Sequence, residues 1–219
     1  MQNSRLCWIC QTNIADTSEH ALKKTDIIRV YGKGSYHKLR EKQPIHFKNG
    51  TQTKLQGANS DVIKNPKDLC KVCNNTLIQP YDRAYDRFIE YIINHNDLIL
   101  ERRFIDFEEI YGKDFPTQQT NLFKYFIKSF GCRIYANPDF KVPTDIIEII
   151  RSDLAYFTTG LKITMSVNKE IINQCGRDIL NSPIGKTEMT YSNLPGIQNQ
   201  FGFNFSEHFG WFFINYFYL

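Results

Sequence analysis

The sequence predicts an α+β fold in which a zinc-stabilised module near the N-terminus is followed by helices and then by a C-terminal β-rich region. Three observations predict it: two Cys-x-x-Cys pairs in the first third of the chain, apolar residues at helical spacing in the middle, and period-two alternation near the end. A soft boundary separates a module over 1–95 from a C-terminal region over 96–219, whose role the sequence leaves open.

The composition is that of an ordinary globular chain. The 219 residues are 42% hydrophobic and 14% aromatic, so a sizeable core can be buried. The formal net charge of +4 permits a nucleic-acid partner without demonstrating one. No signal-peptide pattern precedes the first cysteine, and no apolar run approaches the roughly 18 residues of a spanning helix. We therefore expect a cytoplasmic protein without a membrane partner, whose cysteines bind metal or remain free thiols.

Four of the six cysteines form the strongest motif in the chain. A two-residue spacer lets both thiolates of a pair reach one ion, and two such pairs complete a tetrahedral shell. The alternative is a set of unrelated buried thiols. Cys132 and Cys175 have no partner at metal spacing, and we interpret them as core thiols. The predicted ligands of a structural zinc ion are Cys7, Cys10, Cys70 and Cys73.

The first half of the chain is expected to hold strands followed by a helix. Short stretches at 25–31 and 60–64 alternate between apolar and polar residues and are predicted to be strands. Residues 82–93 are predicted to form an amphipathic helix, because their apolar residues recur at spacings of three and four.

The second half is expected to be helical first and then β-rich. Helices are predicted within 97–130, with Gly131 as the C-terminal stop, and over 145–151. Alternation at 161–167 and 201–205 predicts strands. The aromatic run at 211–219 is either a buried central strand or a subunit interface.

A carboxylate and an imidazole, Glu19 and His20, lie side by side between the two cysteine pairs. The carboxylate can hold a divalent metal, and a neutral imidazole, with a free pKa near ~6.5, can accept a proton from water. A metal on a scissile phosphate neutralises the charge that develops at the leaving oxygen. Such a dipeptide alone is a common surface feature. Its position between the pairs, with Asn74 and Asn75 directly after Cys73, gives it weight.

These motifs together resemble the HNH (ββα-metal) endonuclease family in its four-cysteine form. The resemblance is carried by Cys7-x-x-Cys10, Glu19-His20 and Leu69-Cys70-x-x-Cys73-Asn74-Asn75, followed by Asp82, the order of the subgroup with E-H and C-x-x-C-N-N motifs. It covers roughly residues 7–90, and the ordered set is specific where each motif alone is not. The resemblance implies a metal-dependent nuclease that hydrolyses phosphodiester bonds in DNA.

The resemblance also implies a role for each matched residue. His20 stands where the family has its general base, and Glu19 where it has a ligand of the catalytic divalent cation. Asn74 stands where the closing residue completes that metal site, and Asn65 where the middle asparagine braces the histidine loop. Because oxygen ligands from Glu and Asn suit hard cations, Mg²⁺ or Mn²⁺ is expected. The long interval before Asn74 implies an insertion around residues 32–58.

Other functions remain open at this point. The chain can be a catalytically inactive, zinc-stabilised nucleic-acid-binding or scaffold module, or a nuclease that cleaves RNA. The basic stretch from Lys33 to Lys54 is either an insertion that faces nucleic acid, with His37 or His46 as an extra metal ligand, or a solvated loop. A homodimer is a further expectation, because one ββα-metal site cuts one strand of a duplex.

Overall fold

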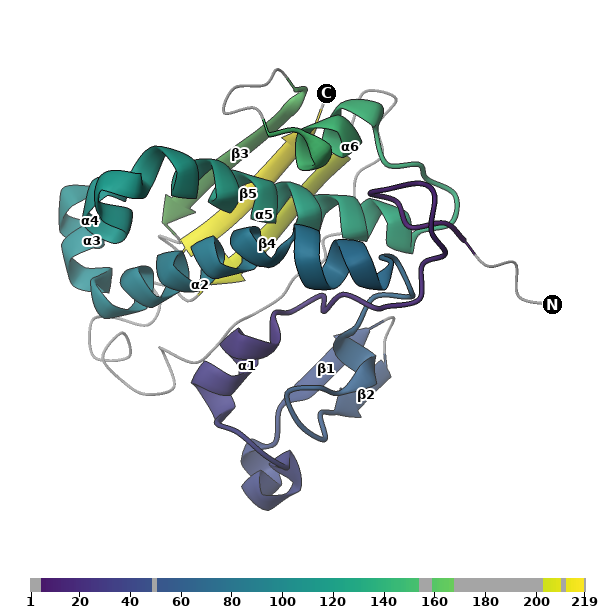
Figure 1. Ribbon diagram of the computed structural model, residues 1–219. Coiled ribbons are helices and arrows are strands. Elements are labelled where there is room, and N and C mark those ends of the chain that lie inside the picture. Colours follow the sequence, from purple (N-terminus) through teal and green to yellow (C-terminus); the bar gives the residue numbers. More distant parts are fainter. Residues whose placement is uncertain (1–4, 49–50, 154–158, 168–202, 210–211, 219) are drawn as a thin grey trace. The chain divides into compact units, whose positions relative to one another are not determined.

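The fold is described by a computed structural model that covers residues 5–48, 51–153, 159–167, 203–209 and 212–218. The structure is mixed α and β, as the sequence predicts (Figure 1). Within the described ranges, no helix combines the length and the apolar character that crossing a membrane requires. Cys175 lies outside the described residues.

The chain divides into two compact units, each of which uses two separate stretches of sequence. One unit combines residues 1–79 with 131–147, and the other combines 80–130 with 148–219. The expected boundary near residue 95 falls inside the second unit. A functional module over 1–95 therefore stays a prediction.

In the first unit, two segments far apart in sequence pair in an irregular antiparallel fashion. Thr17 pairs with Leu69, and His20 pairs with Lys64. The intervening elements are α1 (Lys24–Tyr31), the 3-10 segment η1 (Tyr36–Lys42), β1 (Ile45–Lys48), β2 (Thr51–Lys54) and η2 (Asp61–Ile63). Of these, η1, β1 and β2 lie within residues 32–58, where the family resemblance implies an insertion.

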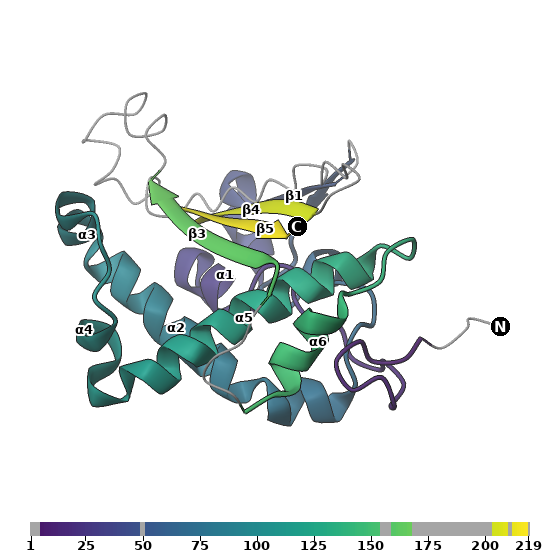
Figure 2. The same ribbon diagram turned by 90° about the horizontal axis from the view of Figure 1, so that it is seen from above.

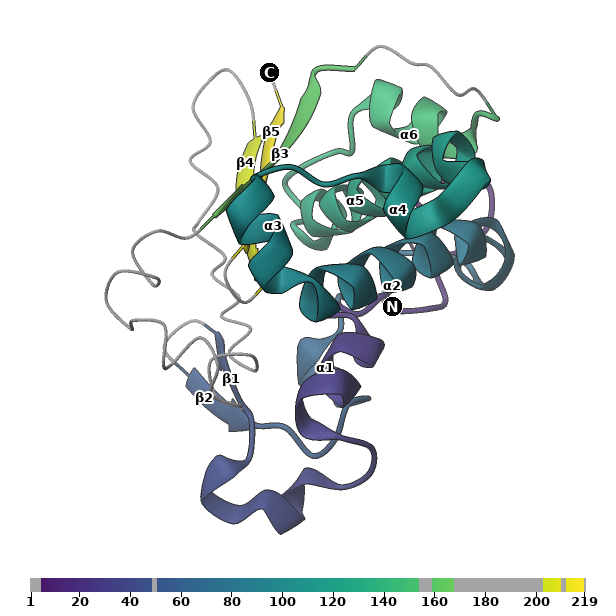
Figure 3. The same ribbon diagram turned by 90° about the vertical axis from the view of Figure 1, so that its left-hand side faces the viewer.

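The intervening elements have a small core of their own. Strands β1 and β2 pair antiparallel, from Ile45 opposite Lys54 to Lys48 opposite Thr51. Figure 3 shows α1 beside this hairpin. The buried side chains that pack together come from α1, η1, η2 and the segment after β2, and they are Ile27, Tyr36, Leu55, Ala58 and Ile63. The insertion is thus a folded element and not an extended loop.

The strands predicted at 25–31 and 60–64 are wrong. Residues 24–31 form α1, and residues 61–63 form a single 3-10 turn. In so short a stretch, apolar residues at 27, 28 and 31 fit a helix as well as a strand. Asp26, in the first turn of α1, also forms an ion pair with Arg29 one turn later. Local charge therefore favours the helix.

The helices of the second unit follow the sequence prediction closely. α2 (Gln79–Asn94) buries the apolar face predicted for it, including Tyr85 and Phe88. The Tyr85 ring stacks on Tyr125, with their centroids 3.9 Å apart. The other helical elements are α3 (Asn96–Arg102), α4 (Phe107–Tyr111), η4 (Gly112–Asp114), α5 (Phe115–Ala136) and α6 (Thr144–Arg151).

Two buried polar contacts tie the helices of this unit together. The Nζ atom of Lys128, which is 1% exposed, lies 3.0 Å from a carboxylate oxygen of Asp82. The hydroxyl of Tyr81 donates to the carbonyl of Ile150 over 3.0 Å. Asp82, the last element of the family-like pattern, therefore has a structural contact within the helical unit.

A three-stranded antiparallel sheet completes the second unit. It contains β3 (Leu161–Val167), β4 (Phe203–Phe209) and β5 (Phe212–Tyr218), in the order β3-β5-β4. The predicted strands at 161–167 and 211–219 are confirmed, and the one predicted at 201–205 begins at Phe203. Tyr216 of the central strand is fully buried and stacks on Phe130 of α5, with centroids 5.8 Å apart. Figure 2 shows the three strands of this sheet above α5. The aromatic C-terminus is thus a central strand.

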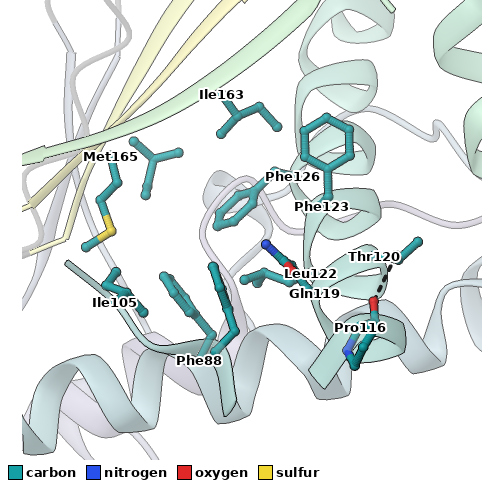
Figure 4. A pocket seen from close by; sticks show the side chains of 12 residues that line it. Phe88, Ile105, Pro116, Gln119, Thr120, Leu122, Phe123, Phe126, Ile163 and Met165 are labelled. Atoms are coloured by element: carbon teal, nitrogen blue, oxygen red, sulfur yellow. Dashed lines mark hydrogen bonds between the residues drawn. The ribbon is translucent and has the colours of Figure 1, made fainter. Parts of the chain in front are cut away.

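A cavity of about 460 Å³ lies within this unit, between α2, α5, the segment before α4, and the sheet (Figure 4). Its wall is mostly apolar, with Phe88 and Phe126 from the helices and Ile163 and Met165 from β3. The hydroxyl of Thr120, which also lines it, donates to the carbonyl of Pro116. The packing between sheet and helices is therefore incomplete at this point.

Gly131 does not end its helix, contrary to the sequence prediction. α5 continues to Ala136. A Cβ atom added at Gly131 would lie 2.5 Å from Cη2 of Trp8. Trp8 is itself only 3% exposed and lies between the first two cysteines. Glycine is needed here for close approach of the indole and not for helix termination.

We expect Gly131→Ala to destabilise the protein. Overpacking typically costs about 1–3 kcal/mol, and alanine regains about 1 kcal/mol of helix propensity, so a net loss of about 1 kcal/mol is expected. Urea denaturation of the metal-loaded protein measures it. In a Trp8→Leu background the same substitution should lose its penalty. A Gly131→Ala protein more stable than the parent would contradict this packing.

Candidate functional site

Four cysteine sulfurs converge in the first unit. The Sγ atoms of Cys7, Cys10, Cys70 and Cys73 all lie within 4.8 Å of one another. The Cys10 and Cys70 sulfurs are 3.8 Å apart, far beyond a disulfide bond. Zn–S bonds of about 2.3 Å in a tetrahedron place the sulfurs roughly 3.8 Å apart. The cluster can therefore hold one metal ion such as zinc, as the sequence predicts.

Backbone amides surround the sulfurs in a pattern that suits thiolates. The amide of Asn13 lies 3.5 Å from Sγ of Cys10, and the amide of Cys73 lies 3.5 Å from Sγ of Cys70. Gln11 adopts a left-handed conformation (φ 58°) that closes the first turn, and its amide donates to the carbonyl of Cys7. Each Cys-x-x-Cys pair thus has local hydrogen bonds of its own.

Burial makes these thiolates depend on a cation. Burial raises the pKa of Cys7, and it raises that of Cys73 together with a hydrogen bond to Cys70. Burial also pushes the pKa of Cys10 upward, but hydrogen bonds from Thr12 and Asn13 outweigh it and lower that pKa to about 6. Metal ligation requires the thiolate form. A bound cation therefore provides the positive charge that stabilises the buried thiolates in place of solvent.

The second cysteine pair begins the helical turns that lead into α2, and the segment before His20 closes onto them. The turns that start at Lys71 pass through a π-helical stretch, Cys73–Leu77. A side-chain oxygen of Asp16 accepts from the amide of Lys71 over 2.9 Å, which satisfies an otherwise open helix-start donor. The amides of Asp16 and Thr17 both donate to the carbonyl of Leu69. The metal cluster and these bonds hold the same two stretches of chain together.

The Glu19–His20 dipeptide is fixed by bonds to the 63–69 stretch. The amide of Glu19 donates to a carboxylate oxygen of Asp68 over 3.0 Å, and the carbonyl of Glu19 accepts from the amide of Asn65 over 2.8 Å. The amide of Ala21 donates to the carbonyl of Ile63. The backbone on both sides of His20 is therefore hydrogen-bonded, which limits where its imidazole can point.

The imidazole of His20 lies in a half-buried setting. Its Nε2 atom is shielded from solvent and has no hydrogen-bond partner among the described residues. Burial lowers the pKa of His20, Glu19 raises it, Lys64 and Lys24 lower it, and a hydrogen bond with Asn59 raises it. The net shift is downward, so the ring is neutral at neutral pH, the state in which it can accept a proton.

Asn74 and Asn65 each contact the stretch that contains Glu19, through different groups. The side-chain amide of Asn74 donates to Oγ1 of Thr17 over 3.1 Å, and Thr17 is two residues before Glu19. Asn65 braces the Glu19 carbonyl through its backbone amide. Their assigned roles at a catalytic metal and in bracing through the side chain stay predictions.

Two supporting residues were not predicted from the sequence. Asp68 is fully buried, and this burial raises the pKa of its carboxyl group to about 6. Hydrogen bonds from the Glu19 amide and from Cys132 lower the same pKa but do not outweigh the burial. Asn59 hydrogen-bonds the His20 ring. The sequence marks Asp68 only as an acidic residue two positions before Cys70. It marks Asn59 only as a polar residue directly after the implied insertion at 32–58.

Comparison with family models, with curated proteins and with solved structures gives no significant match for this chain.

Replacing any one of the four clustered cysteines by serine should release the metal. We expect about one equivalent of zinc in the parent, measured by elemental analysis after gel filtration, and a loss of several kcal/mol in unfolding free energy for each variant, because metal binding is coupled to folding. Cys132→Ala is the matched control, since Cys132 is equally buried but outside the cluster. Equal zinc content in all five variants would refute the site.

The charge balance around His20 can be measured directly by NMR titration of its ring protons in zinc-loaded protein. The midpoint should lie below 6.5, because burial disfavours the imidazolium. Lys64→Gln removes a repelling charge and should raise the midpoint, whereas Asn59→Ala removes a bond that favours the charged ring and should lower it. Shifts in the same direction, or a parent midpoint above 6.5, would contradict this environment.

Proposed function

We propose that this chain is a metal-dependent nuclease of the HNH type that hydrolyses phosphodiester bonds in DNA. One observation supports it most: the four-cysteine cluster joins two distant stretches, one carrying Glu19–His20 and the other carrying Asn74. The order of pairing also supports it, since an antiparallel pair of segments leads directly into a helix that starts at the second cysteine pair.

In this proposal each residue has one task. His20, neutral at neutral pH, accepts the proton of the attacking water. Glu19 and Asn74 provide oxygen ligands for a divalent cation, Mg²⁺ or Mn²⁺. When bound, such a cation supplies charge neutralisation at the scissile phosphate. The cysteine-bound zinc has no part in the chemistry and holds the two stretches in register.

The burial of the His20 ring places a requirement on this mechanism. Because Nε2 is shielded and has no partner among the described residues, water reaches it only after its cover moves. An unpaired buried nitrogen costs about 1–3 kcal/mol, and a water or substrate that reaches it regains that cost. Uncovering the ring is therefore part of productive binding in this proposal.

The same burial favours a second candidate function. A zinc-stabilised nucleic-acid-binding module that performs no catalysis needs no accessible imidazole. The two candidates differ in a simple observation: the nuclease nicks DNA in the presence of Mg²⁺ or Mn²⁺, and the binding module only retards it. RNA as substrate belongs to the first candidate, and a labelled RNA in the same assay separates it from DNA.

The direct test is plasmid nicking by the wild type and by His20→Ala in Mg²⁺ or Mn²⁺. Loss of the general base should lower the rate by at least about a hundredfold. His95→Ala is the matched control, because that ring lies outside the first unit and stacks on Tyr91. Zinc content and unfolding free energy should match in all three proteins. Undiminished cleavage by His20→Ala rejects the assignment.

A further inference from the structure

Positive charge is concentrated in one stretch of the chain. Residues 21–67 carry eleven Lys and Arg against three Asp and Glu, whereas the rest of the chain carries sixteen against twenty. The mild overall charge of +4 thus combines a strongly basic segment with an acidic remainder. The basic segment separates His20 from the second cysteine pair and contains the implied insertion at 32–58.

The cations of this insertion are exposed and available. None of five exposed residues has an ion pair or a hydrogen bond from its side chain within the described part of the protein. They are Lys33, Lys38, Arg40, Lys42 and Lys54. Structural ion pairs involve other residues, such as Lys64 with Asp61. No contact among the described residues therefore indicates a structural role for these five exposed cations.

The η1 segment is anchored at both ends, so the backbone that carries its cations is held in place. The ring of Tyr36 is buried, its hydroxyl donates to the carbonyl of Gly32 over 3.0 Å, and its amide donates to that of Gln56. At the other end, the buried side chain of Gln43 donates to the carbonyl of Leu55 over 2.9 Å. Leu39 packs against the small core between these anchors.

Arg40 lies between the anchors in a strained backbone conformation. Its φ of 50° and ψ of −113° fall outside the regions that a residue with a side chain favours. Such a conformation costs about 1–3 kcal/mol and persists only when the surroundings impose it. Glycine would adopt it at no steric cost. A long, exposed cation at this position brings no compensating contact within the described protein.

We propose that the outward side of η1 binds the sugar–phosphate backbone of duplex DNA, with Arg40 as a preset phosphate contact. The inference rests on the proposed function for its choice of partner. Charge supports a polyanion, and a guanidinium fork matches phosphate geometry. No large apolar side chain is exposed between Lys33 and Lys42, so the segment lacks the wedge that a membrane-surface element inserts.

The test is fluorescence anisotropy of a labelled duplex with the full chain, carried out in a His20→Ala background so that no cleavage occurs. Binding is measured between about 50 and 200 mM salt, and the slope of log affinity against log salt reports phosphate contacts, at about 0.9 for each. Replacing Lys38 and Lys42 by Ser together with Arg40→Gly should lower the slope by about 2–3. Arg83→Ala, an exposed cation on α2, should leave it unchanged.

Arg40→Gly alone separates a functional arginine from a structural one. It should lower the salt slope by about one while leaving the denaturation midpoint equal or higher, because glycine relieves the strain. Glu41→Gln, which removes the acid within η1, should strengthen binding. A triple variant with the parent slope overturns the inference, and so does tighter binding to vesicles containing phosphatidylserine than to the duplex.

The outcomes also separate this inference from the proposed nuclease activity. A wild-type protein that binds duplex through η1 but does not nick it removes the nuclease proposal and leaves the DNA contact standing. A wild-type protein that nicks DNA, while the η1 triple variant keeps the parent's affinity and slope, removes the contact alone.

Discussion

The convergence of four sulfurs is the constraint on which the rest of the first unit depends. Between Cys10 and Cys70 the chain runs through fifty-nine residues and returns to the same point. The entropy of closing so long a loop has to be offset by something local, and metal–thiolate bonds are strong enough to do it. The bonds of Asp16 and Thr17 to the Cys70 region operate only once that closure is made.

The indole between the first two cysteines extends this constraint to a helix. Trp8 packs against the one position of α5 where a backbone without Cβ allows its approach. The last turns of α5 therefore belong to the unit that contains the cysteine cluster. The guanidinium of Arg5 lies over the Tyr135 ring, 3.7 Å from its centroid, and adds a second contact between the N-terminal stretch and this helix end. The cysteine cluster, the Trp8 ring and the end of α5 pack together. Loss of a bound ion should therefore also weaken the packing of Trp8 against α5.

The sequence predicts what depends on periodicity and on motif spacing. α2, α6, β3 and β4 are predictable because each has a repeated pattern, and the cysteine cluster is predictable because its spacing admits few alternatives. α1 was missed because eight residues are too few to separate the two periods. The prediction that Gly131 ends its helix is wrong, because the glycine is required by a tertiary contact with Trp8. Asp68 and Asn59 are not predictable from the sequence, because residues that support a site through hydrogen bonds have no characteristic spacing in a motif.

The unpaired Nε2 of His20 and the backbone of Arg40 are two of the local costs in the first unit. Nε1 of Trp8 and one carboxylate oxygen of Asp68 are likewise buried without a partner among the described residues. Each costs about 1–3 kcal/mol, against a total stability of about 5–15 kcal/mol for a typical domain. Such costs are expected where a partner, absent from the free protein, completes the interaction. A hydrated phosphodiester offers both missing partners, an anion for the guanidinium and a water for the imidazole. If the proposed DNA contact forms, one polyanionic ligand would offset both of these local costs.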